Sequence, residues 1–279
     1  MRIKGRKTMI RNLSFIAAVA TVYCTAGCSS IRINLAGYTD STTVPVSMEY
    51  TGVEVESAIE VVLTDTENDV LIESDANVLP YVEVYEDNRG IINIRYSTGL
   101  KLRGDGYYRT IVRIPYKEDI RSISASGAST VSSERPFVSE SLNISVSGAS
   151  RINCTQVTAD YISMSLSGAG RVKCETLEAE YLDIHASGAS SLTTSGNADK
   201  CNIQLDGAST LDGRAVYSDS ALYVNKCSGS LSGGSTAWFS TDGGTIECSL
   251  SGGSHIYYSG TAYSNSTVSG GSSVEAVRF

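Results

Sequence analysis

The residues of this chain that could carry redox or metal chemistry are cysteines and histidines, and they are widely spaced. Five cysteines lie in the second half of the sequence: Cys154, Cys174, Cys201, Cys227 and Cys248. The two histidines are His185 and His255. Structural zinc sites commonly contain a CxxC pair and zinc proteases an HExxH helix, and neither spacing occurs here. The sequence therefore predicts no metal site and no bound cofactor.

Three aspartates are the best candidates for acid–base chemistry. Asp212, Asp219 and Asp242 lie in or near one stretch of the second half. Glycoside hydrolases need two carboxylates that converge on the scissile bond, and other polysaccharide-cleaving enzymes need carboxylates that bind a cation. Acidic loop residues are more commonly only solvated, and the sequence contains no GxSxG motif. We predict a protein that is not an enzyme, with a polysaccharide lyase or hydrolase as the alternative.

Aromatic residues offer a candidate binding surface near the C-terminal end. Trp238 and Phe239 are followed 19 residues later by Tyr257 and Tyr258. Exposed aromatic rings can contact sugar rings or partner proteins. The same rings could instead stabilise a sheet by packing across adjacent strands. We keep these four residues as candidate ligand-binding residues.

A repeat of about 20 residues determines where these side chains lie. Phrases such as SGAS recur along the second half, and each contains one corner glycine: Gly127, Gly148, Gly168, Gly188, Gly207, Gly233, Gly252 and Gly270. One interval, between Gly207 and Gly233, is longer by about six residues. A strict period of this length is typical of a repeat architecture.

The residues on either side of each corner glycine alternate in polarity. Apolar residues occupy positions six, four and two before the glycine and position four after it, as in Leu142, Ile144, Val146 and Ile152 around Gly148. Period-two alternation predicts strands with one buried face, and glycine permits the positive φ of a sharp corner between two strands. The sequence predicts an all-β fold, a parallel β-helix or β-solenoid with coils of about 20 residues. A sandwich of antiparallel hairpins is the alternative.

Stacked coils would bring cysteines of adjacent coils together. Cys154 and Cys174 both lie six residues after a corner glycine, and Cys201 and Cys227 both lie six residues before one. Parallel strands about 4.8 Å apart place such Cα atoms within the range of a disulfide. Free buried thiols are the other interpretation, so these four residues are candidate disulfides or stacked thiols.

The first 48 residues differ in composition from the rest of the chain. Residues 1–27 contain five basic residues, no acidic residue and an apolar run, and they end in Ala26 and Gly27 before Cys28. This order is typical of a lipoprotein signal peptide, which predicts lipidation at Cys28 and anchoring to a membrane. Residues 28–48 are mostly small and polar and predict a flexible tether. An ordinary secretion signal is the alternative.

The remaining sequence divides into two parts, and its charge excludes one class of partner. Residues 49–122 contain strand-like segments without the repeat and predict a β-rich N-terminal cap, and residues 123–279 carry the eight repeats. The chain has a formal net charge of −8, and the basic signal segment leaves the rest more acidic still. Nucleic-acid binding needs clustered lysine and arginine, so we expect no nucleic-acid partner.

The order of these segments resembles one family of bacterial lipoproteins. VEVESAIEVVLTDTENDVLIESD, GIINIRY, IRSISASGAST and the serial SGAS phrases together resemble the putative auto-transporter adhesin, head GIN domain family over roughly residues 50–279. The resemblance implies a β-helical fold and a location in the bacterial cell envelope, and it supplies no catalytic residues. We expect an adhesin-like binding module for a glycan or an envelope protein. A purely structural envelope lipoprotein is the further alternative.

Overall fold

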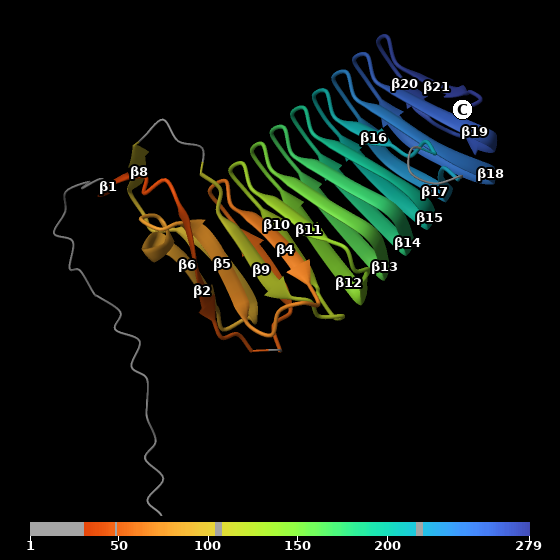
Figure 1. The fold of residues 1–279 in the computed structure, drawn as a ribbon. Helices are drawn as coiled ribbons and strands as arrows, with labels where there is room; N and C mark the ends of the chain where they lie inside the picture. The colour runs from red at the N-terminus through yellow and green to blue at the C-terminus, as the bar shows by residue number, and fades with distance from the viewer. Residues whose placement is uncertain (1–30, 48, 104–107, 216–219) are drawn as a thin grey trace, which may run out of the picture.

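The computed structural model describes residues 31–47, 49–103, 108–215 and 220–279. The segment expected to be a signal peptide, including the lipidation candidate Cys28, lies outside the described residues. The described chain is all-β, and its only helical element is a short 3-10 turn, η1 (Leu79–Tyr81). One two-stranded sheet and one 19-stranded sheet contain all its strands (Figure 1).

The N-terminal strands have four to six residues, whereas the longer strands of the repeat have 10 to 16. The first nine are β1 (Ile31–Asn34), β2 (Thr39–Val44), β3 (Gly52–Val55), β4 (Glu60–Thr64), β5 (Val70–Asp75), β6 (Val82–Glu86), β7 (Ile91–Tyr96), β8 (Leu100–Arg103) and β9 (Ile111–Pro115). The repeat contains β10 (Ser122–Ala125), β11 (Thr130–Ser133), β12 (Phe137–Val146), β13 (Arg151–Leu166), β14 (Arg171–Ala186), β15 (Ser191–Leu205), β16 (Thr210–Asp212), β17 (Leu222–Leu231), β18 (Thr236–Leu250), β19 (His255–Ser264), β20 (Thr267–Val268) and β21 (Ser273–Ala276).

Successive strands of the repeat pair in parallel and in register. Between β13 and β14, Ile152 lies opposite Val172 and Met164 lies opposite Ile184. The same pairing continues through β15, β17, β18 and β19, and Figure 1 shows these strands as a stack of similar levels. Equivalent residues of successive repeats therefore lie one above the other. Antiparallel hairpins are wrong for this segment, because its described strand pairings are all parallel.

One continuous strand, and not two, joins most successive corners. Seven residues of β13 are buried: Ile152, Cys154, Val157, Ala159, Ile162, Met164 and Leu166. They form three groups: Ile152 with Cys154, Val157 with Ala159 (the Val157 group), and Ile162 with Met164 and Leu166. Buried residues are two positions apart within a group and three positions apart between groups. The inward side of the strand changes at these two places, so the strand bends there. The Val157 group is an inward face that the sequence pattern did not predict.

The corner glycines stack closely, as expected. All eight have φ between 68° and 79°, a conformation that residues with a Cβ rarely adopt. The amide of Ala169 donates to the Gly148 carbonyl at 2.8 Å, and the amide of Ala189 donates to the Gly168 carbonyl at 2.7 Å. A Cβ built on Gly168 would lie only 2.9 Å from the Gly148 oxygen. Both the backbone conformation and the close approach therefore require glycine.

A serine lies two residues after most corner glycines, and its hydroxyl mostly bonds within its own corner. The buried hydroxyl of Ser235 donates to the carbonyl of Ser232 at 2.9 Å, and that of Ser254 donates to Ser251 at 2.9 Å. A hydroxyl contact between adjacent coils links Ser190 and Ser209 at 3.4 Å. The carbonyl three residues earlier is the nearer acceptor.

The N-terminal strands extend the stack and then change direction. β3 pairs in parallel with β10 and β7, and β4 pairs in parallel with β11 and β9. Ser57 and Ala58, between β3 and β4, have positive φ values of 71° and 60° beneath the corner of Gly127. Beyond this level β5 pairs antiparallel with β9, and β6 pairs antiparallel with β7. Antiparallel strands therefore lie at this end of the stack.

Part of the expected tether is ordered in strands. β2 pairs antiparallel with β5 from Thr39↔Asp75 to Val44↔Val70, and β1 pairs in parallel with β8. The flexible tether predicted for residues 28–48 is therefore wrong for both strands. The small polar side chains of β2 gave no apolar pattern for the prediction to use, because β2 is largely exposed and is held by backbone pairing and not by apolar burial.

Candidate functional site

Trp238 and Tyr257 lie one above the other, as the sequence predicts, but the faces of the Trp238 ring are covered. The rings of Trp238 and Tyr257 stack with centroids 4.2 Å apart. The Arg214 guanidinium lies 4.6 Å from the Trp238 centroid, and Arg214 is itself ion-paired with Asp212 at 2.8 Å. Phe279 packs edge-on against Trp238 at 5.9 Å. The geometry matches packing between coils better than a platform for a sugar.

Phe239 and Tyr258 do not belong to an exposed aromatic surface. They lie opposite each other in β18 and β19, but Phe239 is only 1% exposed and Tyr258 packs against the core. Adjacent residues of a strand point to opposite faces. Trp238 and Phe239 therefore cannot both face solvent, and Phe239 is withdrawn as a ligand-binding residue.

The five cysteines of the repeat are buried free thiols. Cys154 lies opposite Cys174, and Cys201 lies opposite Cys227, as the repeat predicts. Cys248, which has no cysteine at its own repeat position, approaches Cys227 with 3.9 Å between the sulfur atoms. Burial raises the pKa of the Cys201 thiol above its usual range. Such a protonated buried thiol is a poor nucleophile and metal ligand.

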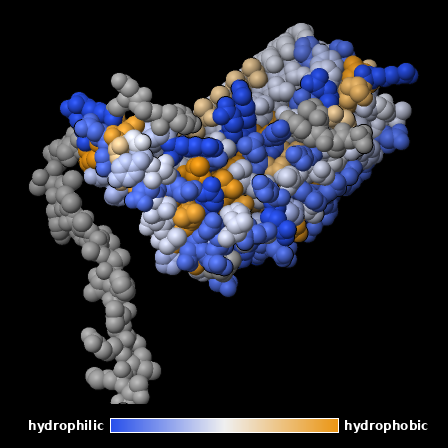
Figure 2. Space-filling model, viewed as in Figure 1, coloured by the Kyte–Doolittle hydropathy of each residue, from blue (hydrophilic) through white to orange (hydrophobic). Residues whose placement is uncertain are grey.

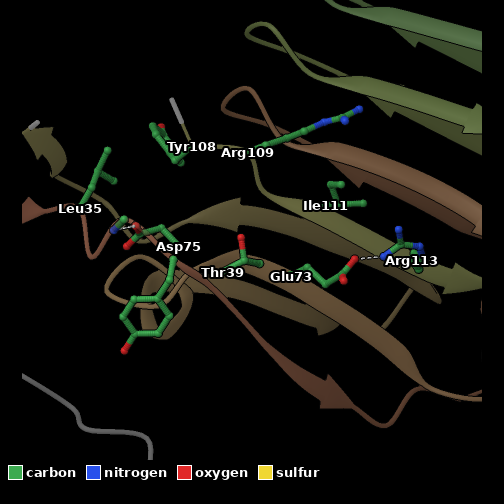
Figure 3. Close-up of a pocket in the computed structure, with 10 residues that line it drawn as sticks. Leu35, Thr39, Glu73, Asp75, Tyr108, Arg109, Ile111 and Arg113 are labelled. Atoms are coloured by element: carbon green, nitrogen blue, oxygen red, sulfur yellow. Dashed lines mark hydrogen bonds and ion pairs between the residues drawn. The ribbon is translucent and has the colours of Figure 1, made fainter. Parts of the chain in front are cut away.

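A pocket in the N-terminal region, the cap pocket, is lined by Leu35, Thr39, Glu73, Asp75, Tyr108, Arg109, Ile111 and Arg113 (Figure 3). Its volume is about 430 Å³. Glu73 forms an ion pair with Arg113, which Figure 3 marks with a dashed line. Arg109 forms an ion pair with Glu60. The charges around the cap pocket are therefore largely neutralised by one another.

Asp75 in the cap pocket is a structural carboxylate. It accepts hydrogen bonds from the backbone amides of Ala36 at 3.0 Å, Gly37 at 2.9 Å and Asn77 at 3.0 Å. Burial opposes its ionisation, but these amides outweigh burial and lower the pKa of Asp75. A general acid for glycoside cleavage needs a raised pKa. Asp75 stays ionised and is unsuited to that role.

Asp212 and Asp242, the two described carboxylates near the longer repeat, are each bonded to a neighbouring side chain. Hydrogen bonds from Arg214 lower the pKa of Asp212 despite its partial burial. Asp242 accepts a hydrogen bond from the Thr261 hydroxyl at 2.9 Å, and Asp219 lies outside the described residues. No group of three or more His, Cys, Asp or Glu side chains in the described ranges could hold a metal ion.

A polar surface on the strand segments before the corners is the better candidate. We call it the Asp183 face, and its outward residues form three columns: Tyr161, Tyr181, Lys200 and Lys226; Ser163, Asp183, Asn202 and Ser228; Ser165, His185, Gln204 and Ser230. Hollows of about 250 Å³ and 410 Å³ lie on it. Tyr161 and Tyr181 are each 39% exposed and stack with centroids 5.7 Å apart.

Asp183 connects the three columns. Its carboxylate accepts a hydrogen bond from the Asn202 amide at 2.7 Å and from the Tyr161 hydroxyl at 3.4 Å. The Nε2 atom of His185 lies 3.2 Å from the same carboxylate. Asp183 is only 17% exposed, whereas His185 is 43% exposed. The network holds a tyrosine, an amide and an imidazole in fixed positions with part of each side chain open to solvent.

Sequence reasoning missed this face because its chemistry is distributed over several repeats. Tyr161 and Tyr181 occupy the same repeat position, seven residues before a corner glycine, and this spacing was the available signal. Figure 2 shows a surface that is mainly hydrophilic, with separate small hydrophobic clusters and a line of pale orange atoms along the edge where the corners lie. In the ranges that the structure describes, no helix is long and apolar enough to cross a membrane.

Comparison with known proteins gives one family and several similar folds. Residues 49–262 match the family model described as "Putative auto-transporter adhesin, head GIN domain". A putative adhesin from Parabacteroides distasonis is 19% identical, with 88% of this chain and 100% of that chain covered and a TM-score of 0.76. A putative adhesin from Parabacteroides merdae is 17% identical, with 88% and 99% covered and a TM-score of 0.69.

A third similar structure carries a different description. It is a putative lipid binding protein from Parabacteroides distasonis, 13% identical, with 89% of this chain and 100% of that chain covered and a TM-score of 0.67. At these identities the similarity establishes a shared fold and not a shared ligand. A comparison with curated proteins gives no match.

Proposed function

This chain belongs to the putative auto-transporter adhesin, head GIN domain family, and from that premise we propose that it is a non-catalytic, adhesin-like binding module of the bacterial cell envelope. Its ligand is a glycan chain that lies along the Asp183 face. Residues 122–276 form a parallel β-helix, and this fold presents the face as a rigid surface. Residues 1–27 are a signal peptide, and a lipid on Cys28 anchors the protein to a membrane.

The observation that carries the glycan proposal is the Asp183 network. Sugar hydroxyls are both donors and acceptors, and sugar rings have apolar faces and edges. The Asp183 face offers the matching groups: a carboxylate, amides, an imidazole and hydroxyls beside two half-exposed tyrosine rings. Adjacent coils lie about 4.8 Å apart, so groups of one kind recur along the stack. An extended polymer can contact several coils at once, and many weak contacts then add up.

The carboxylate geometry favours binding over cleavage. Asp75 and Asp212 are held ionised by amides and by Arg214, respectively. Asp183 is engaged by three neighbouring side chains. Cleavage requires one carboxyl group that holds a proton near neutral pH. The surroundings of Asp75 and Asp212 lower the pKa of both carboxyl groups and so favour the wrong protonation state for that role.

Parallel in-register pairing from β10 to β21 and the corner glycines of positive φ support the β-helix. The inward side of the longest strands changes twice per coil, which supports a coil that closes around its own core. The family description supports an envelope location. The basic segment, the apolar run and the small residues before Cys28 support the anchor.

The test is glycan binding by the purified chain with paired variants. Asp183→Ala removes the centre of the network, and Tyr161→Ala with Tyr181→Ala removes the rings. Trp238→Ala is the matched control, because it removes an aromatic ring that belongs to the same stacked strands but lies outside the Asp183 face. We expect a glycan array to identify a ligand whose affinity falls about tenfold or more in the first two variants, as loss of hydrogen bonds to a charged group predicts, and stays unchanged in Trp238→Ala.

Two results would contradict this proposal. Binding lost in Trp238→Ala but kept in Asp183→Ala would move the ligand to the aromatic stack. Turnover of a polysaccharide by the purified chain, abolished by Asp183→Ala, would make the protein an enzyme.

A further inference from the structure

Lys200 and Lys226 form an unusual feature of the Asp183 face. They are cross-strand partners in β15 and β17, so two ammonium groups of the same sign are held on adjacent coils. Like charges directly opposite each other across a sheet are destabilising. Lys200 has one distant carboxylate neighbour, Glu180, at 3.8 Å, and Glu180 is 69% exposed. Lys226 has no ion-pair partner among the described residues.

The two lysines stand beside a tyrosine and border a hollow. The hollow of about 410 Å³ is lined by Tyr181, Lys200, Cys201, Lys226, Cys227, Ser228, Thr245 and Glu247. In the column of outward residues, Tyr181 lies opposite Lys200, and both residues line the hollow. The chain as a whole is acidic, with a net charge of −8. A paired basic position is therefore not part of a general basic surface.

From this arrangement we propose that the glycan bound by the Asp183 face is acidic, with a carboxylate-bearing sugar such as a hexuronate seated in the hollow beside Tyr181. Its carboxylate lies between the Lys200 and Lys226 ammonium groups and removes their mutual repulsion. Its ring lies against Tyr181. This inference rests on the proposed glycan-binding function and specifies the class of sugar.

Glu247 limits how far the binding site for the acidic sugar extends along the stack. It is the partner of Ser228 in the next coil and is exposed at the far border of the hollow. A second carboxylate of the ligand beyond Lys226 would approach Glu247 and be repelled. The acidic sugar is therefore placed at the two lysines and not farther along the stack.

The experiment compares a galacturonate oligosaccharide with its methyl ester, which has the same rings and no charge, by calorimetry on the full chain. The variants are Lys200→Gln with Lys226→Gln, Glu247→Gln, and Lys101→Gln as the matched control on the exposed strand β8. We expect the free acid to bind about tenfold or more tightly than the ester, as charge-assisted hydrogen bonds predict. The double lysine variant should abolish this preference, Lys101→Gln should keep it, and Glu247→Gln should tighten binding of the acid.

The outcomes separate this inference from the proposed function. Equal affinity for acid and ester, lost in Asp183→Ala, would overturn the acidic subsite and keep glycan binding. If a neutral glycan binds and neither galacturonate probe does, the proposed site for an acidic sugar is likewise wrong and glycan binding is kept. An equal loss of acid binding in Lys101→Gln would show only general attraction of charge and would overturn the subsite. Absence of binding to every glycan tested would overturn the proposed function itself.

Discussion

The ring of Trp238 lies directly over that of Tyr257, with centroids 4.2 Å apart and planes inclined by 26°. The two residues are register partners in β18 and β19, so their contact follows from parallel stacking of equivalent positions. Aromatic pairs in such contact contribute about 0.5–1.5 kcal/mol beyond simple burial. The same relationship, repeated for other residue types, builds the Asp183 face and aligns the cysteines.

Neighbouring residues Trp238 and Phe239 should differ in their effect on stability. Phe239→Ala empties a position that is 1% exposed, and we expect a loss of about 4 kcal/mol in the free energy of unfolding. Trp238→Ala removes a half-buried ring that packs between Arg214 and Tyr257, and we expect about 2 kcal/mol. Urea unfolding monitored by circular dichroism measures both. Equal losses would contradict the opposite orientation of the two side chains.

Substitution of a corner glycine should be costly for two separable reasons. Gly168→Ala imposes a positive φ on alanine and places a Cβ 2.9 Å from the Gly148 oxygen, so we expect a loss of about 3 kcal/mol. Gly243 has a similar φ of 74°, but a Cβ at this position would have no neighbour within 4 Å. Gly243→Ala should therefore cost only about 1 kcal/mol. The denaturant midpoints of the two variants measure this difference. Equal losses in the free energy of unfolding would argue against close stacking of the corners.

The five described cysteines should all be free and unreactive in the folded protein. In a chain carrying Cys24→Ser and Cys28→Ser, a thiol reagent should react slowly under native conditions and should count five thiols in denaturant without reductant. Burial explains the slow reaction. A count of three or one would show that a disulfide forms between neighbouring cysteines, and mass spectrometry of peptides would identify which pair.

Asp75 should make the free energy of unfolding depend on pH in the acidic range. Its folded pKa is lowered by backbone amides against the opposing effect of burial. It therefore contributes stability above its unfolded pKa of about 3.9, and this contribution is lost as the pH falls through the lower folded pKa. Asp75→Asn should be less stable than the natural chain at pH 7, and the difference should shrink below about pH 4. A difference that is constant with pH would contradict this role.

Lipidation at Cys28 remains a prediction from sequence. Cys24, four residues earlier, provides the control cysteine. Metabolic labelling with an alkyne fatty acid should mark the natural chain and the Cys24→Ser variant but not the Cys28→Ser variant. Fractionation should place only the labelled forms in the membrane, because buried methylene groups supply the attachment. Membrane retention of Cys28→Ser would contradict a lipid anchor at this residue.

Local sequence was enough to predict the stacking direction and the inward positions of the repeat. Glycine at each corner and apolar residues at Leu142, Ile144 and Val146 act through backbone sterics and burial, which are properties of one repeat. The face around Val157 was missed because the strand bends without any glycine or proline to mark the place. The strands within residues 31–44 were missed because their stability depends on pairing with distant β5 and β8.

The candidate site was harder to predict for a related reason. Trp238 and Tyr257 were correctly paired, but Arg214 covers the ring from the longer repeat between Gly207 and Gly233, where the regular period gives no guidance. Phe239 was misplaced because alternation along one strand was not applied to it. The Asp183 network joins residues from three coils, and no single repeat contains its pattern.

The central claim is that equivalent residues of successive coils form straight columns, and distances between spin labels test it most directly. Ser124, Ser145, Ser230 and Ser249 belong to one column. Labels at 145 and 230, at 145 and 249, and at 124 and 249 span four, five and six steps. With about 4.8 Å per step, the predicted spacings are about 19, 24 and 29 Å. Distances without this constant increment would contradict the account.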